Sequence, residues 1–73
     1  MARTRYWVVP DEGIWELRRE RTYLSSHAYK AQAVAEGRRI ARENPPSQLL
    51  IMHADGTFET EATYGADPYP PKG

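Results

Sequence analysis

The chain has 73 residues, no cysteine and a formal net charge of zero. This length allows one small domain, which buries only about 60% of the surface that its unfolded chain exposes. The lack of cysteine excludes a disulfide scaffold and a thiolate metal site, and the zero net charge argues against a generic nucleic-acid binder with a basic surplus. The apolar run at residues 6–9 is far too short for a signal peptide or a membrane span. We therefore expect a soluble, cytoplasmic protein without a membrane partner.

The charges are unevenly distributed along the chain. Residues 1–42 hold nine Lys/Arg and five Asp/Glu, whereas residues 43–73 hold one Lys and five Asp/Glu, so the two parts carry +4 and −4. This asymmetry fits a basic face for an anionic partner. It equally fits attraction between the two parts, within one chain or between copies.

The N-terminal part is predicted to form a β-hairpin from residues 6–9 and 14–18. Both runs are rich in β-branched and aromatic residues, and the Pro-Asp-Glu-Gly segment between them is typical of a turn. With these four residues as the loop, Val9 faces Ile14. Residues 20–28 are polar and irregular, and we interpret them as a loop.

An amphipathic helix is predicted from about residue 29 to residue 43. Its inner stripe consists mostly of small residues at helical spacing: Ala33, Val34, Gly37, Ile40 and Ala41. Asn44 precedes two prolines and ends the helix, because the residue before a proline is pushed out of the α region. A stripe of small residues lets such a helix lie close to a sheet.

A second hairpin is predicted from residues 48–53 and 58–64. The Asp-Gly dipeptide at residues 55–56 is a strong signal for a tight type I′ turn. Pairing across this turn sets His53 opposite Phe58. The alternation of the last strand then turns Phe58 toward the helix.

These elements predict an α+β fold of order ββαββ: a four-stranded antiparallel sheet with one helix packed on one face and a proline-rich C-terminal tail at residues 65–73, all in one domain over residues 1–73. The expected helix-facing core is Tyr6, Val8, Trp15, Leu17, Val34, Ile40, Leu49, Ile51 and Phe58. The opposite face is expected to hold five sizeable apolar side chains: Trp7, Val9, Ile14, Leu50 and Met52. An apolar face of this size calls for a cover.

Several motifs along nearly the whole chain are shared with a known family: Tyr6-Trp7-Val8-Val9-Pro10, Trp15-Glu16-Leu17, Ala33-Val34, Arg39-Ile40-Ala41, His53 with Asp55-Gly56, Thr63-Tyr64-Gly65, and Asp67-Pro68 with Pro70-Pro71-Lys72-Gly73. With them the chain resembles the small prokaryotic family catalogued as domain of unknown function 2188. Two residues depart from the pattern: Tyr29 replaces a threonine-like helix cap, and Gly37 replaces a frequent alanine. The resemblance implies a bacterial or phage protein and supports the fold, but it implies no reaction, substrate or binding site.

The candidates for chemistry lack the partners that chemistry needs. The Ser-Ser-His segment at residues 25–27 has no evident third group to orient the histidine, and His53 with Asp55 supplies two metal ligands where a stable site wants three or four. Glu59 and Glu61 share one face of a strand, but an open sheet face does not supply the cleft that would divide acid and base roles between them. We therefore expect no enzyme, no cofactor and no metal site.

Two functions remain from the sequence. The first is a protein-interaction or self-assembly role, with a homodimer or a protein partner, and uses the sheet face opposite the helix. Its expected residues are Trp7, Val9, Ile14, Leu50, Met52 and, from the tail, Tyr69. As an alternative to an intermolecular contact, the tail covers this face of its own chain, with Tyr69 lying across Trp7.

The second function is nucleic-acid binding through arginines of the helix and the second strand. The possible phosphate contacts are Arg18, Arg19, Arg21, Arg38, Arg39 and Arg42. Aromatic side chains such as Trp7 on a sheet also suit stacking on bases. Glu36 and Glu43 oppose this function, because intrahelical pairing with arginines gives an ordinary solvated face.

Overall fold

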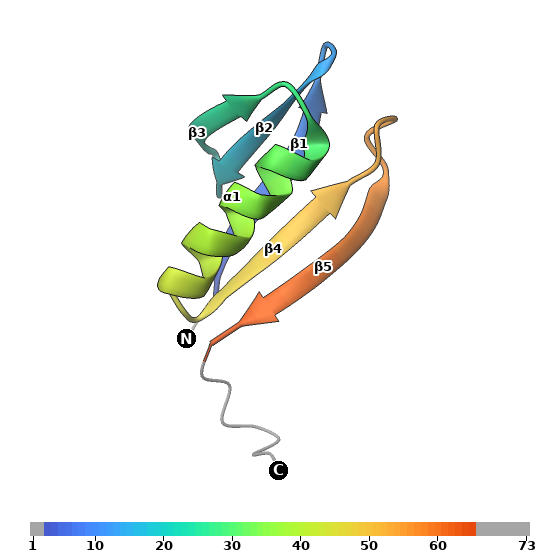
Figure 1. Ribbon diagram of the computed structural model, residues 1–73. Helices are drawn as coiled ribbons and strands as arrows, with labels where there is room; N and C mark the ends of the chain where they lie inside the picture. The colour runs from blue at the N-terminus through green and yellow to red at the C-terminus, as the bar shows by residue number, and fades with distance from the viewer. Residues whose placement is uncertain (1–2, 66–73) are drawn as a thin grey trace.

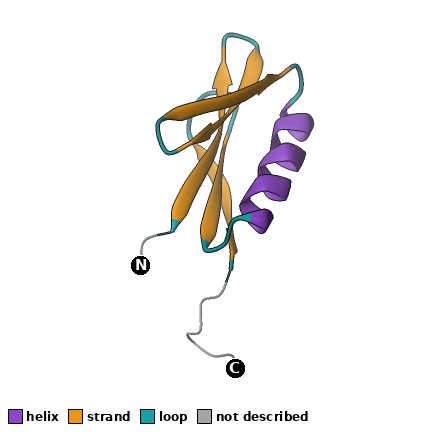
Figure 2. Ribbon diagram, turned by 90° about the vertical axis from the view of Figure 1, so that its left-hand side faces the viewer, coloured by secondary structure: helices purple, strands orange, loops and turns teal. Residues whose placement is uncertain are grey.

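The computed structural model describes residues 3–65 (Figure 1). Its elements follow in the order β1 (Thr4–Asp11), β2 (Ile14–Arg19), β3 (Thr22–His27), α1 (Lys30–Glu43), β4 (Ser47–Met52) and β5 (Phe58–Tyr64). The strands form one mixed sheet in the spatial order β3-β2-β1-β4-β5, in which β1 and β4 are parallel and the other neighbours are antiparallel. The helix lies along one face of this sheet, as Figure 2 shows from the side. The predicted α+β class with one helix on a sheet is confirmed.

The prediction of four antiparallel strands is wrong, because residues 22–27 form strand β3 instead of a loop. β3 is an edge strand that pairs only with β2, from Thr22 opposite Arg19 to His27 opposite Trp15. An edge strand is half exposed and carries mostly polar side chains, so its hydrophobic pattern is weak. Leu24 is its one side chain that packs against the core.

The additional strand also explains why β1 and β4 are parallel. β3 returns the chain to the end of the sheet where β1 finishes, and α1 then runs back along the sheet to the end where β1 begins (Figure 1). β4 therefore starts beside the start of β1, with Ser47 opposite Thr4 and Ile51 opposite Val8. If only two strands preceded the helix, β4 would run antiparallel to β1.

The first hairpin has a shorter loop than predicted. Its loop consists of Glu12 and Gly13, whose φ angles of 51° and 89° are those of a type I′ turn. The register consequently moves by two residues, and Val9 pairs with Glu16 instead of Ile14. Because side chains alternate with a period of two, this shift leaves every residue on its predicted face.

The second hairpin has a longer loop than predicted. Its backbone closes when the His53 N–H donates to the Thr57 carbonyl at 2.7 Å and the Gly56 N–H donates to the His53 carbonyl at 2.9 Å. Gly56 has a φ of 89°, but Asp55 does not have the positive φ that a type I′ turn requires. The carboxylate of Asp55 instead accepts hydrogen bonds from the Thr57 backbone and hydroxyl. This is a three-residue loop with glycine in the left-handed position.

The longer loop is followed by a bulge that changes two predicted faces. Ile51 pairs with Thr60 as predicted, but the register shifts next to it and Phe58 pairs with Met52. One extra residue inverts the alternation, so Phe58 lies on the face opposite the helix and is 52% exposed. Its prediction as a core residue is wrong. Glu59 turns to the helix side, where it contacts Lys30, and therefore does not share a face with Glu61.

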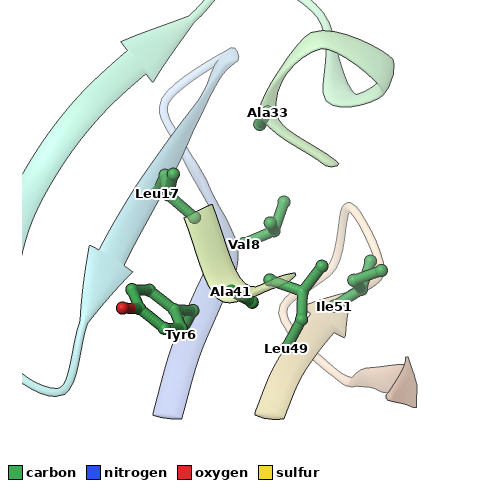
Figure 3. Close-up of a cluster of buried hydrophobic side chains, with 7 residues drawn as sticks. All are labelled: Tyr6, Val8, Leu17, Ala33, Ala41, Leu49 and Ile51. Atoms are coloured by element: carbon green, nitrogen blue, oxygen red, sulfur yellow. The ribbon is translucent and has the colours of Figure 1, made fainter. Parts of the chain in front are cut away.

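The core lies between α1 and the three central strands β2, β1 and β4. Its seven buried apolar residues are Tyr6, Val8, Leu17, Ala33, Ala41, Leu49 and Ile51 (Figure 3). Partly buried residues pack around them: Trp15, Leu24, Val34, Ile40 and Tyr64. All the predicted core residues except Phe58 are among these two groups. At the end of the helix the Ser47 hydroxyl is buried and donates to the Ala41 carbonyl at 2.5 Å.

We expect Gly65→Ala to destabilise the protein by about 2–3 kcal/mol, because two penalties combine. Gly65 has a φ of 113°, and a β-carbon there would lie 2.7 Å from atoms of both Pro45 and Pro46. Gly56→Ala is the matched control, since Gly56 also has a positive φ but open space around it. Urea denaturation should show a smaller loss for this control, of about 1 kcal/mol. Equal losses in the two variants would contradict the close packing at Gly65.

Candidate functional site

The candidate site is the sheet surface that faces away from α1. Tyr6 and Val8 of β1 are buried under the helix. Side chains alternate along a strand, so Trp7 and Val9 point to the side of the sheet away from the helix. The pairings extend this surface to the neighbouring strands. We call it the open face and define it by the residues Arg5, Trp7, Val9, Asp11, Ile14, Glu16, Arg18, Gln48, Leu50, Met52, Phe58 and Glu61.

The centre of the open face is apolar. Trp7 pairs with Leu50 across the parallel β1–β4 ladder, and the next outward residues along these strands are Val9 and Met52. These four side chains are half-buried by one another, whereas Ile14 at the edge of the group is 39% exposed. The structure thus brings together on one surface the five apolar residues that the sequence suggested for it. Tyr69 lies outside the described residues.

Carboxylates gather at one end of the open face. Glu16 forms an ion pair of 2.9 Å with Arg18, and these two residues line a shallow hollow of about 340 Å³ with Val9, Pro10 and Asp11. The hydrogen bond from Arg18 lowers the pKa of Glu16. A hydrogen bond with Glu16 and the negative charge of that group raise the pKa of Asp11. The two carboxyl groups therefore interact with each other, and the Arg18 guanidinium pairs with Glu16.

Charges of both signs lie at the beginning of β1. Arg5 is exposed there, two positions before Trp7, and its backbone N–H donates to the Glu20 carboxylate at 3.0 Å. On the β4 side of the face, the Gln48 side-chain amide donates to the Glu61 carboxylate at 2.5 Å. The open face is therefore an apolar centre with charged and polar groups of both signs around it. This is the general composition of a protein–protein interface.

The six arginines considered for phosphate binding do not form one surface. Arg18 lies on the open face and is paired with Glu16, and Arg39 on α1 is held by Glu36 at 2.5 Å and Glu43 at 3.2 Å. The others are exposed and form no ion pair within residues 3–65: Arg19 and Arg21 at the β2–β3 turn, and Arg38 and Arg42 on the helix.

Strand β3 brings Ser25 and His27 together on the helix side of the sheet. The Ser25 hydroxyl and His27 Nε2 are 2.9 Å apart, which the interpretation of this segment as a loop did not anticipate. The neighbouring Ser26 points to the other side, and its hydroxyl lies 2.7 Å from the Tyr23 hydroxyl. Nucleophilic catalysis also requires donors for an oxyanion and a place for the substrate. Within residues 3–65, His27 has no second hydrogen-bond partner that would orient its ring toward Ser25.

Glu59 connects the beginning of α1 to strand β5. It accepts a hydrogen bond from Lys30, which lowers the pKa of Glu59, and the Lys30 ammonium also lies 5.2 Å from the centre of the Trp15 ring. His53 Nδ1 lies 3.5 Å from the same carboxylate. Across residues 3–65, no three His, Asp or Glu side chains are placed to hold a metal ion. Sequence reasoning missed this contact because it depends on the bulge at Glu59.

A family model described as "Uncharacterized protein conserved in bacteria (DUF2188)" matches residues 6–64. The chain belongs to this family. The match begins in β1 and ends at the last residue of β5, and it confirms the resemblance seen in the sequence. No curated protein and no solved structure matches the chain. In the part of this DUF2188 protein that the structure describes, no helix is long and apolar enough to cross a membrane.

We expect Glu16→Gln to lower the pKa of Asp11 toward its ordinary value of 3.8, because the substitution removes the carboxylate that hydrogen-bonds with Asp11 and, with it, the neighbouring negative charge. In the wild type the raised pKa favours the protonated folded state. This contribution to stability is fully present at pH values below the pKa that Asp11 has in the unfolded chain. It is lost as the pH rises through the higher pKa that Asp11 has in the folded protein. NMR titration of the side-chain carboxyl carbons measures the pKa of Asp11 in the wild type and in Glu16→Gln. Glu59→Gln, on the other side of the sheet, is the control and should leave Asp11 unchanged; a raised pKa that persists in Glu16→Gln would contradict the assigned cause.

Proposed function

We propose that this DUF2188 protein is a small, non-catalytic self-assembly module whose open face binds a second copy of the chain. The observation that carries the proposal is that β1 and β4 are apolar on both faces. Residues 6–9 and 49–52 are continuous apolar runs, although α1 covers only one side of them. Continuous runs of this kind are typical of strands that are buried on both faces, whereas strands with one solvated face alternate with polar residues.

The chemistry of the uncovered residues supports a protein partner. Trp7 and Met52 belong to the residue types that are enriched in the centres of protein interfaces, and the charged residues of the open face lie around them. Transfer of the exposed parts of these side chains out of water is favourable by roughly 25 cal/mol per Å² of apolar area. A cover over the centre therefore stabilises the assembled state.

The charges favour a copy of the same chain over a polyanion. The chain has no net charge, so two copies do not repel each other as whole molecules. Asp11, Glu16 and Glu61 would repel the phosphates of a nucleic acid that approached the open face. Two of the six arginines that would bind phosphate are already neutralised by carboxylates. Nucleic-acid binding is therefore an outcome of the test below and not the favoured function.

A non-catalytic role agrees with the form of the surface. The hollow beside Glu16 is shallow and open to water, so the opposite pKa shifts of Asp11 and Glu16 arise on an open surface and not in the enclosed cleft that acid–base chemistry uses. The absence of cysteine agrees with a reducing cytoplasm as the place of action.

The test is Trp7→Asp, which places a carboxylate in the centre of the proposed interface. Sedimentation velocity should show a concentration-dependent dimer for the wild type at tens of micromolar and a folded monomer for the variant, with circular dichroism as the check of folding. Tyr29→Asp is the matched control. It makes a similar aromatic-to-acid change at a side chain that is 68% exposed beside the helix, and it should leave the dimer intact.

Two results would overturn the proposal. The first is a wild type that stays monomeric at several hundred micromolar with Trp7 fluorescence shielded from quenchers, which would indicate that the tail covers the open face of its own chain. The second is binding of an oligonucleotide with a steep salt dependence that Trp7→Asp leaves unchanged and that Arg38→Gln with Arg42→Gln abolishes.

A further inference from the structure

Resting on the proposed function, we propose that Phe58 belongs to the interface and that Lys30 positions it there through Glu59. Phe58 and Glu59 are neighbours at the start of β5 and lie on opposite faces of the sheet. Which of the two lies on the open face depends on the bulge between the pairs Ile51–Thr60 and Met52–Phe58. The ion pair of Glu59 with Lys30 holds this bulge, and the bulge presents Phe58 to the second copy.

The start of β5 has two ways of pairing with the end of β4. In the observed pairing Glu59 is the extra residue of the bulge, and Phe58 pairs with Met52 on the open face. In a pairing without a bulge, Glu59 is opposite Met52 and Phe58 is opposite His53. A register change of one residue inverts the faces, so the phenyl ring then lies on the helix side and the carboxylate on the open face. The two pairings exchange these two side chains.

Local preferences favour the pairing without a bulge. Its two-residue loop is the Asp55-Gly56 dipeptide, which suits a tight type I′ turn. A bulge leaves its extra residue unpaired in the ladder, whereas a regular ladder pairs every residue. The observed pairing also leaves Phe58 52% exposed, and exposure of a large apolar side chain is unfavourable. The observed pairing therefore depends on an interaction that offsets these costs.

That interaction is the contact between Glu59 and Lys30 on the helix side of the sheet. The two groups form a hydrogen-bonded ion pair, and both side chains are only about one-third exposed. The Lys30 ammonium also lies 5.2 Å from the centre of the Trp15 ring, a distance at which the ring attracts the cation. His53 Nδ1 lies 3.5 Å from the Glu59 carboxylate. A carboxylate on the open face would lose both cationic neighbours.

The exchange determines the chemistry of the open face beside Met52. In the observed pairing Phe58 extends the apolar centre from Val9 and Met52 onto the edge strand β5. In the other pairing Glu59 would take this place and would lie on the same face as Glu61, two residues further along the strand. The bulge therefore puts a phenyl ring where a second carboxylate would lie. Aromatic side chains are enriched at protein interfaces, and a second copy would remove this ring from water.

Phe58→Ser tests whether the ring belongs to the interface. We expect this variant to weaken the dimer at least about tenfold in sedimentation velocity, because each copy loses an aromatic group from the contact. Tyr29→Ser is the matched control. It removes an aromatic side chain that is 68% exposed beside the helix, and it should leave the dissociation constant unchanged. A Phe58→Ser protein that associates as tightly as the wild type would overturn the interface role of Phe58.

Lys30→Met tests the positioning role, because it removes the ammonium group and keeps an unbranched side chain beside Trp15. Cross-strand nuclear Overhauser effects between backbone protons distinguish the two pairings. In the wild type they should connect Phe58 with Met52, and in Lys30→Met they should connect Phe58 with His53. The dimer of Lys30→Met should be weakened about as much as that of Phe58→Ser. Lys30→Arg keeps the ion pair and should retain both the pairing and the dimer.

Two further variants separate positioning from a general loss of stability. Arg39→Met removes a paired cation from the outer side of the same helix and should change neither measurement. Deletion of Glu59 removes the bulge residue, so Phe58 directly precedes Thr60 and stays opposite Met52 without the ion pair. Lys30→Met combined with this deletion should therefore dimerise like the wild type.

The outcomes distinguish this inference from the proposed function. A wild type that does not self-associate overturns the proposed function together with the interface role of Phe58. A Lys30→Met protein in which Phe58 still pairs with Met52 overturns the positioning role and leaves self-assembly standing. A deletion of Glu59 that fails to restore the dimer overturns it as well. If Lys30→Met does not fold, Glu59→Ala breaks the same ion pair from the other side, and the same two measurements decide.

Discussion

The close approach of α1 to the sheet at Gly37 is the contact on which the rest of the structure depends. A β-carbon at Gly37 would lie 2.8 Å from a methyl carbon of Leu49 and 3.1 Å from one of Leu17, so the helix backbone rests directly on these two side chains. The two leucines come from β4 and β2, the strands on either side of β1. The helix therefore spans the three central strands and buries Val8 beneath it.

A single helix cannot cover more than this. With side chains a helix is about 10 Å wide, and strands lie about 4.8 Å apart, so one helix shields two to three strands of one face. The edge strands β3 and β5 are accordingly more exposed than the central strands, and Tyr23 and Phe58 on them are both more than half exposed. Lys30, at the beginning of the helix, forms an ion pair with Glu59 of β5 on the less covered side of the sheet. The second face has no regular element of residues 3–65 above it.

The sequence was sufficient for features that depend on strong local patterns. The helix follows from its stripe of small residues and from Asn44 before two prolines, and the faces of β1 and β2 follow from alternation, which survives a two-residue error in register. The edge strand β3 was missed because only Leu24 reaches the core. The faces predicted for Phe58 and Glu59 were wrong because a one-residue bulge inverts the alternation of side chains. The sequence carries no signal for this bulge.

For the candidate site, the sequence identified the apolar residues but not their arrangement. Neighbours across β1 and β4 depend on a parallel pairing that exists only because β3 reverses the chain before the helix. The Ser25–His27 contact and the Lys30–Glu59 contact depend on the missed strand and the missed bulge in the same way. Pairing geometry between distant segments therefore limited the prediction more than residue type did.

Strand β3 also determines where the apolar surface lies. With three strands before the helix, the two strands that are apolar on both sides, β1 and β4, become neighbours near the middle of the sheet. Trp7 and Leu50 are thereby adjacent at the centre of the open face, and the charged residues of β2 and β5 lie around them. The order of the strands therefore determines that the apolar residues of the open face lie at its centre and the charged residues at its margins.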